Sequence, residues 1–453
     1  MTAPWDAVRM TSALPHTGEA TELLQALIRN GCVNDGTADS GGERRNADTL
    51  AAYLEGSGVD VERFTAHGDR TSIVARIEGS DPSAPRLCLM GHTDVVPVSP
   101  AGWSRDPFGG DLVDGEVWGR GAVDMLNITA TMAVGFRQLA LSGFRPKGDI
   151  IYFGVADEEA AGQYGAEWMI ENHWDAIACD YVLTEMGGWT HGDGRHVGIS
   201  VGEKGAAWRR LRVGGTPGHG SMPFGADNAV ITASEVVRRL AAYRPAAHLD
   251  ELWTMRVMAS NLPDDVKAGL LDPSRLEETL ALLPVPTAKL LHACSHTTIS
   301  PNMFHGGVKT NVIPDIVDIE VDIRTVPGDD TDTVRAYLDE ALGDLSSKVE
   351  IEVMFDDLSS ISSTRTPLYE VLERRTQRVF PTSELLPEVI VGATDSRFFR
   401  AKGVVAYGTG LMSPDITFET FASRFHGHDE RIDTESLGLS TDYWIGVCRD
   451  LSE

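Results

Sequence analysis

Hydrophobic and polar positions follow one pattern through the first two hundred residues. Short apolar runs bounded by turn residues begin at residues 87, 149 and 180, and each predicts a buried strand. Helical periodicity lies between these runs, at 129–141 and 163–172. Continuously apolar strands that alternate with helices are typical of a mostly parallel sheet with helices on both faces.

A second pattern begins near residue 205. Here apolar and polar residues alternate, as in WRRLRV and VDIEVDIR, which predicts strands with one solvent-exposed face. The predicted elements are a strand at 208–213, a helix at 228–240, strands at 297–304 and 317–324, a helix at 332–342 and a strand at 349–355. This order is typical of a ferredoxin-like α+β sandwich.

The first pattern returns after residue 358. We therefore predict one α/β domain formed by residues 1–204 and 359–453, which is interrupted by an inserted α+β domain at 205–358. A leucine-rich segment at 246–292, inside the insert, is expected to be helical.

Composition narrows the class of protein. The 453 residues include 39 basic and 67 acidic side chains, a net charge of −28, which argues against nucleic acid or an anionic membrane surface as a partner. No apolar run approaches the ~18 residues of a membrane span, and MTAPWDAVRM does not resemble a signal peptide. Five scattered cysteines without a C-x-x-C pair predict free thiols in a cytoplasmic protein.

Candidate chemistry follows the predicted buried strands. His92 and Asp94 follow the first, the pair Glu158-Glu159 follows the second, and Glu185 follows the third. A single histidine is more often a core or loop residue, and adjacent glutamates are more often solvated. At a strand end, however, adjacent side chains point different ways, so one glutamate can ligate a metal while the other faces a substrate.

Nine motifs occur in a fixed order between residues 20 and 435. They are GHTDVVPV, GRGAVDM, ADEEAAGQYGAEW, LTEMGG, GTPGHGSMP, NVIPD, VDIRT, GATDSRFF and FHGHDERI. In this order the chain resembles the M20 family of dizinc peptidases and aminoacylases. The resemblance implies a hydrolase that cleaves the amide bond of an N-acyl amino acid or a short peptide with a free carboxylate.

The resemblance also implies roles for residues of the α/β domain. His92 and Glu185 are expected to hold one Zn²⁺, Glu159 and His426 the other, and Asp124 to bridge them, with a cis peptide after Asp124; Co²⁺ or Mn²⁺ could substitute. Asp94 would orient the imidazole of His92, and Glu158 would be the general base that activates the metal-bridged water. His428 is the alternative to His426, whose spacing to Glu430 matches the motif.

The inserted domain resembles the family's lid. His219 is expected to stabilise the oxyanion, commonly from the partner subunit of a homodimer, while Asn311 and Arg324 would bind the substrate, with Arg324 on its carboxylate. Gly392 and Ala393 are expected to line the substrate site.

Alternatives remain open at this point. Arg324 could instead pair with Asp322 on a wet sheet face, and residues 246–292 could cover the lid of a monomer. A carbamoyl or ureido amidohydrolase of the same fold is the alternative activity. A non-enzymatic binding protein would have lost a ligand or the base, and the sequence retains both.

Overall fold

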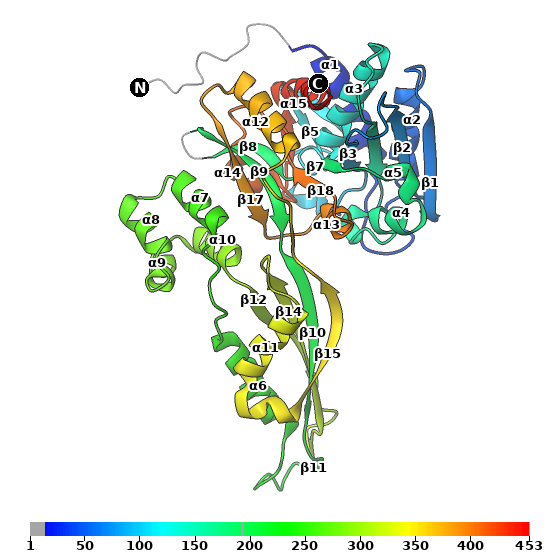
Figure 1. Ribbon diagram of the computed structural model, residues 1–453. Helices are drawn as coiled ribbons and strands as arrows, with labels where there is room; N and C mark the ends of the chain where they lie inside the picture. The colour runs from blue at the N-terminus through cyan, green and yellow to red at the C-terminus, as the bar shows by residue number, and fades with distance from the viewer. Residues whose placement is uncertain (1–13, 192–193, 453) are drawn as a thin grey trace.

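A ten-stranded sheet forms the core of the larger part of the molecule (Figure 1). The strands are β1 (Val61–His67), β2 (Arg70–Ile77), β3 (Leu87–His92), β6 (Ile150–Val155), β7 (Tyr181–Thr184), β8 (Gly187–His191), β9 (His196–Glu203), β16 (Ser360–Ile361), β17 (Glu384–Ile390) and β18 (Val405–Gly408). β6, β3, β7 and β18 pair in parallel in that order. The computed structural model describes residues 14–191 and 194–452, so the predicted absence of a signal peptide concerns residues that lie outside this description.

Helices cover both faces of this sheet, which explains the continuously apolar strands. Leu87 and Leu89 of β3 belong to one core, and Cys88 and Met90 of the same strand belong to another. The first core includes α1 (Thr17–Asn30), α2 (Arg44–Leu54), α3 (Leu126–Leu141), α12 (Pro367–Val379) and α15 (Thr434–Leu451), and the second includes α4 (Ala166–Asn172), α5 (Trp174–Ile177) and α13 (Ser396–Ala401). The predicted fold class is confirmed.

The insert forms a separate four-stranded antiparallel sheet (Figure 1). Its strands, in spatial order, are β12 (Thr298–Gly306), β14 (Ile316–Thr325), β10 (Gly205–Gly214) and β15 (Val349–Asp357). Helices α6 (Ala229–Ala242) and α11 (Thr331–Leu342) cover one face and share a core with it, as the split βαβ order predicts. A short pair, β11 (Gly218–His219) and β13 (Val312–Ile313), lies at the end far from the large sheet.

The leucine-rich segment is helical, as expected, but its location could not be predicted. It forms α7 (Glu251–Ala259), α8 (Asp264–Leu270), α9 (Leu276–Ala281) and α10 (Val285–Ser295), which share a small core of their own. In the sequence it lies between two strands of the small sheet, yet α7 packs beside β17 of the large sheet. We call α7–α10 the helical segment.

Several elements differ from the sequence prediction. Residues 187–191 and 196–203 form β8 and β9, which were not predicted because glycines interrupt the periodicity; at Gly188, with φ +94°, the backbone packs against Gly410. β17 ends at Ile390, and the GATDSRFF motif that follows it leads into the helix α13. The other elements are β4 (Asp111–Val113), β5 (Glu116–Trp118), β19 (Arg431–Asp433), α14 (Phe418–Arg424), and the 3₁₀-helices η2 (Pro100–Gly102), η3 (Glu158–Ala160) and η4 (Gly343–Lys348). Among the residues described, no helix is long and apolar enough to span a bilayer.

Candidate active site

Polar side chains from three neighbouring strands meet at the carboxyl edge of the large sheet. His92 ends β3, Glu158 and Glu159 follow β6 in η3, and Glu185 follows β7. Because these strands run in parallel, their carboxyl ends lie side by side. His92 Nε2 lies 3.9 Å from Glu185 Oε2.

Asp124 lies between two histidines that are distant in the sequence. Its Oδ1 is 3.2 Å from His92 Nε2, and its Oδ2 is 2.8 Å from His426 Nε2. His426 Nε2 is also 3.5 Å from Glu159 Oε2. The Asp124–Met125 peptide is cis, as the resemblance implies. Each carboxylate oxygen of Asp124 thus faces one histidine, which is the arrangement that a bridging ligand requires.

The donor set fits divalent cations. Ligand atoms of His92, Asp124 and Glu159 lie within 4.8 Å of one another, and Glu159 Oε1 is buried with no hydrogen-bond partner among the described residues. Carboxylate oxygens and imidazole nitrogens without a thiolate suit Zn²⁺, Mn²⁺ or Co²⁺. The ring of His428, the alternative ligand, packs against Gly102 instead.

The electrostatics of this cluster also indicate that it needs positive charge. Burial and neighbouring carboxylates raise the pKa of Glu158 and Glu185 well above the usual value. Burial alone would lower the pKa of both histidines, but the carboxylates facing them raise it well above the usual value for His92 and to about 10 for His426. Burial would raise the pKa of Asp124, and hydrogen bonds from the two histidines hold it low instead. Bound cations would supply the charge that protons supply here.

Asp94 contacts both the imidazole of His92 and the loop of the glutamate pair. His92 Nδ1 lies 3.0 Å from the backbone carbonyl oxygen of Asp94, whereas the Asp94 Oδ1 atom is 3.6 Å away. The carboxylate instead accepts hydrogen bonds from Asn34 Nδ2 at 2.8 Å and from the backbone N–H groups of Glu159 and Glu158, at 3.1 and 3.3 Å. Asp94 therefore holds both the imidazole tautomer and the loop that carries the glutamate pair.

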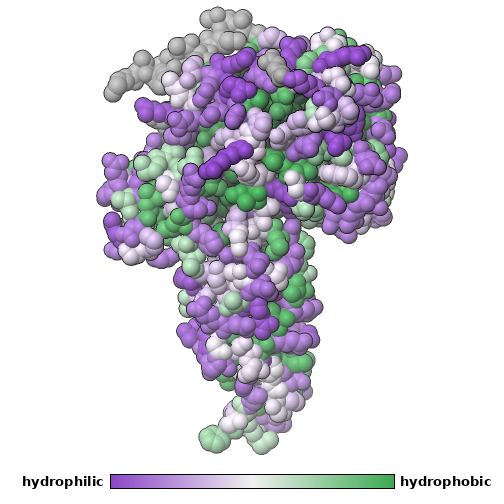
Figure 2. Space-filling view, viewed as in Figure 1, coloured by the Kyte–Doolittle hydropathy of each residue, from purple (hydrophilic) through white to green (hydrophobic). Residues whose placement is uncertain are grey.

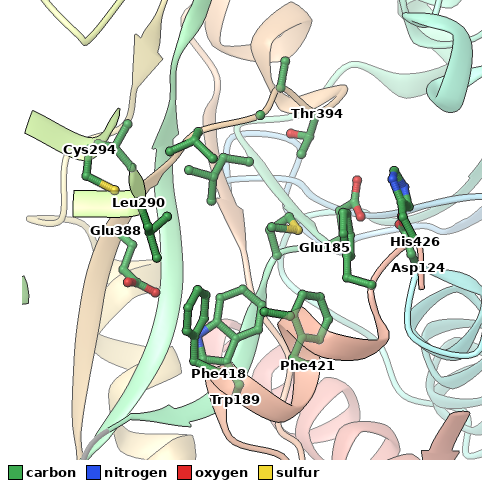
Figure 3. A pocket seen from close by; sticks show the side chains of 18 of the residues that line it. Asp124, Glu185, Trp189, Leu290, Cys294, Glu388, Thr394, Phe418, Phe421 and His426 are labelled. Atoms are coloured by element: carbon green, nitrogen blue, oxygen red, sulfur yellow. The ribbon is translucent and has the colours of Figure 1, made fainter. Parts of the chain in front are cut away.

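A cavity of about 380 Å³ adjoins the cluster (Figure 3). Figure 3 shows Asp124, Glu185 and His426 on one side of it, Leu290, Cys294 and Glu388 on the other, and Trp189, Phe418 and Phe421 between them. Glu158, Glu159, Gly392 and Ala393 also line it. Four of the five residues expected to hold metal, the expected base Glu158, and two of the four residues expected to bind the substrate therefore line one pocket.

Comparison with known proteins assigns the chain to a family. The model of peptidase family M20/M25/M40 matches residues 88–450. The chain belongs to this family. The resemblance inferred from the motifs is thereby confirmed, and the protein is a metal-dependent hydrolase.

Individual M20 relatives differ in their named substrates. The chain is 29% identical over 397 residues to the N-fatty-acyl-amino acid synthase/hydrolase PM20D1 of Xenopus tropicalis, which spans 83% of this chain and 74% of that relative. It is 28% identical over 427 residues to succinyl-diaminopimelate desuccinylase of Phenylobacterium zucineum (strain HLK1), which spans 92% and 94%. The crystal structure of the M20 family metallo-carboxypeptidase Sso-CP2 from Sulfolobus solfataricus has the same fold, with a TM-score of 0.69, 18% identity, and coverage of 97% of this chain and 99% of that one.

Glu430 connects the two motifs that carry Asp124 and His426 in this M20 chain. Its buried carboxylate lies 2.6 Å from Arg120 Nη1 and accepts hydrogen bonds from the backbone N–H groups of Gly121, Val123 and Asp124, at 3.1, 2.7 and 3.1 Å. In the sequence, Glu430 is distinguished only by its spacing from His426. Arg120, the one basic residue of GRGAVDM, reads as an ordinary surface arginine in the sequence, so its buried pairing with Glu430 could not be predicted.

Asp395 is a second buried acid that the sequence analysis missed. It follows Thr394, and neither of its carboxylate oxygens has a hydrogen-bond partner within the described ranges. Burial raises its pKa to about 7, which adds another acid to the surroundings of Glu158. Nothing in the GATDSR motif distinguishes this aspartate from an ordinary helix-capping residue.

The three residues predicted on the inserted domain lie outside the pocket. His219, on β11, is exposed, and its Nδ1 is 2.8 Å from Ser221 Oγ. Asn311 is also exposed beside it at the far end of the small sheet (Figure 1). Arg324 donates to Asp322 Oδ1 at 2.9 Å, which is the alternative pairing considered above. A single chain does not bring these side chains to the carboxylate cluster.

Proposed function

We propose that this protein hydrolyses the amide bond of an N-acyl amino acid or a short peptide that has a free carboxylate. The observation that carries the proposal is the position of Asp124 between His92 and His426, with Glu158 beside them in the wall of the same pocket. This arrangement can hold metal ions, a water and a substrate carbonyl together. Its named relatives act on amide bonds of N-acylated amino acids.

We assign the metal ions to the predicted ligands. His92 and Glu185 would hold one ion, Glu159 and His426 the other, and Asp124 would bridge them. Two Zn²⁺ ions, or Co²⁺ or Mn²⁺ in their place, would polarise the amide carbonyl and lower the pKa of the attacking water. The orphaned Oε1 of Glu159 and the crowded buried carboxylates support this assignment.

Glu158 is assigned as the general base. Its carboxyl group lies in the pocket wall and holds no metal ion in this assignment, so it is free to take up and release a proton. It would take this proton from the attacking water and pass it to the leaving nitrogen. Asp94 fixes the backbone of Glu158 and Glu159 and so positions both side chains.

A homodimer would bring the predicted residues of the inserted domain to the active site. We propose that the small sheet is a lid and that His219 and Asn311 act on the pocket of the partner subunit, with Arg324 on the substrate carboxylate. The edge strands β12 and β15 support this proposal, since they expose Met303 and Phe355, and Figure 2 shows apolar residues along the outer side of the small sheet.

A substrate panel tests the proposed reaction. Purified protein supplied with Zn²⁺ would be incubated with N-acyl amino acids, dipeptides and N-carbamoyl amino acids, and the products followed by mass spectrometry. We expect turnover of N-acyl amino acids or dipeptides and its loss in Glu158→Gln, with Glu171→Gln, an exposed glutamate on α4, as the matched control. No turnover by metal-loaded protein, or full activity of Glu158→Gln, would refute the proposal. Turnover of carbamoyl substrates alone would favour the ureido alternative.

A further inference from the structure

The pocket beside the metal cluster has strongly apolar walls. Trp189 packs against Phe421 and Phe418, with ring centroids 4.5 and 5.7 Å apart, and these rings form one wall between the metal cluster and the far end in Figure 3. Ile390 of β17 and Leu290 of α10 also line the pocket. A surface of this kind binds hydrocarbon through the area that it removes from water.

The distribution of charge shows which half of a substrate this pocket can hold. Apart from His426 in the cluster itself, Arg256 is the only cationic side chain among the described residues that line the pocket, and its Nη1 lies 2.6 Å from Glu388 Oε1. A free amino acid carboxylate would therefore meet other carboxylates near the cluster and an already paired arginine at the far end. The amino acid half is better placed on the open side of the cluster, and the acyl half in the pocket.

The far wall comes from the helical segment, which is held against the large sheet by polar contacts. Arg256 of α7 pairs with Glu388 of β17, and Lys204 Nζ donates to the carbonyl oxygens of Ala293 and His296 at the end of α10, at 2.8 and 2.6 Å. These contacts tie α7 and α10 to the strands that form the other walls. The helical segment is thus a fixed part of the pocket.

The Arg256–Glu388 pair closes the pocket at this end. Glu388 is 4% exposed and also lies 3.0 Å from His191 Nε2, so its carboxylate is held on two sides. Behind the pair is a second cavity of about 40 Å³, lined by Trp253 and Val326. Both cavities share Arg256 and Glu388 as lining residues. A methylene chain that passed this point would have to break a buried ion pair and leave its charges without partners.

We propose that this pocket binds a linear apolar acyl chain of the substrate and that the Arg256–Glu388 pair sets the longest chain the enzyme accepts. The inference rests on the proposed amide hydrolysis and adds to it the acyl class and the residues that select it. The helical segment is then the specificity element, and Leu290 contacts the chain before it reaches the ion pair.

A chain-length series tests the inference. With one amino acid held constant and acyl groups from acetyl to octadecanoyl, we expect kcat/KM to rise about fourfold per methylene until the chain reaches the ion pair, and to fall beyond that length. Leu290→Trp narrows the pocket and is expected to shift the optimum to shorter chains. The matched control is Leu282→Trp, on the same helical segment but 80% exposed, which is expected to leave the profile unchanged.

A second variant tests the length limit separately. The double substitution Arg256→Met with Glu388→Gln replaces the buried pair by neutral side chains of similar size, a change that proteins often tolerate. It is expected to extend the accepted length into the second cavity. A flat profile that Leu290→Trp does not alter would overturn the inference while the proposed hydrolysis stood. An unshifted limit in a folded double variant would overturn the role of the ion pair. Failure to cleave any N-acyl amino acid would overturn the proposed function itself.

Discussion

Replacing Glu430 by glutamine tests what holds the two halves of the metal cluster together. In the native structure the Glu430 carboxylate neutralises Arg120 and accepts three backbone hydrogen bonds from the loop that ends at Asp124. The arginine is almost fully buried, and its Nε has no partner within the part of the chain that the structure describes. Glutamine keeps the size of the side chain and one acceptor oxygen but removes the charge.

The free-energy cost of this substitution follows from these contacts. Breaking a buried ion pair by neutralising one partner costs about 3–5 kcal/mol, because the other charge remains buried without compensation. Since about 1.4 kcal/mol corresponds to a factor of ten, the loop from Gly121 to Asp124 should open about 10²–10⁴ times more often in Glu430→Gln. An open loop displaces Asp124, so metal affinity should fall with it.

Hydrogen–deuterium exchange measured by mass spectrometry reports the opening of this loop directly, because three of its exchanging amides are those that donate to Glu430. We expect faster exchange in the peptide over residues 119–126, and unchanged exchange in β14 of the small sheet. Glu419→Gln, an exposed glutamate on α14, is the matched control. If the 119–126 peptide exchanges in Glu430→Gln at the rate of the control, the reasoning about this buried network is wrong.

Three further outcomes are expected. Glu158→Gln should lower kcat by about 10²–10⁴ with unchanged metal content, measured by steady-state assay and elemental analysis; loss of metal would instead make it a ligand. Chelation should abolish activity, and Zn²⁺, Co²⁺ or Mn²⁺ should restore it with two ions per chain. Glu277, His292 and His296 form a separate group in the helical segment, and an unchanged count of two ions in His296→Ala would show that this group is not part of the centre. His219→Ala and Glu158→Gln, each inactive alone, should regain part of the activity when mixed, because a dimer of the two retains one intact site; no recovery on subunit exchange would exclude action from the partner subunit.

The metal cluster shows how much of the site could be predicted from the sequence. Buried strands that end in His92, Glu159 and Glu185 indicated one sheet edge, since apolar runs reveal strands and parallel strands share their carboxyl edge. The motifs added Asp124 and His426, whose side chains meet in the structure as expected. The metal ligands could be predicted from the sequence because only a few residue types can coordinate a metal ion.

The hydrogen bonds and ion pairs that support the metal cluster could not be predicted from the sequence. Asp94 was expected to orient the imidazole, but nothing in the sequence indicated that its backbone carbonyl would make that contact while its carboxylate holds the glutamate loop. Glu430 and Arg120 are 310 residues apart, and Arg256 and Glu388 are 132 apart. Charged residues of either kind look like surface residues in a sequence, so their pairing in the interior has no local pattern.

The sequence by itself determined the periodicity of each segment, and with it the two-sheet architecture, the helical character of residues 246–292 and the set of candidate ligands. Only the tertiary structure decided that the helical segment packs beside β17, that Trp189 and Phe421 line a pocket with Leu290, and that an ion pair closes it. Local patterns record how much of each side chain is buried, because burial repeats with the period of a helix or a strand. They do not record which distant surface buries it, and that choice shapes the pocket.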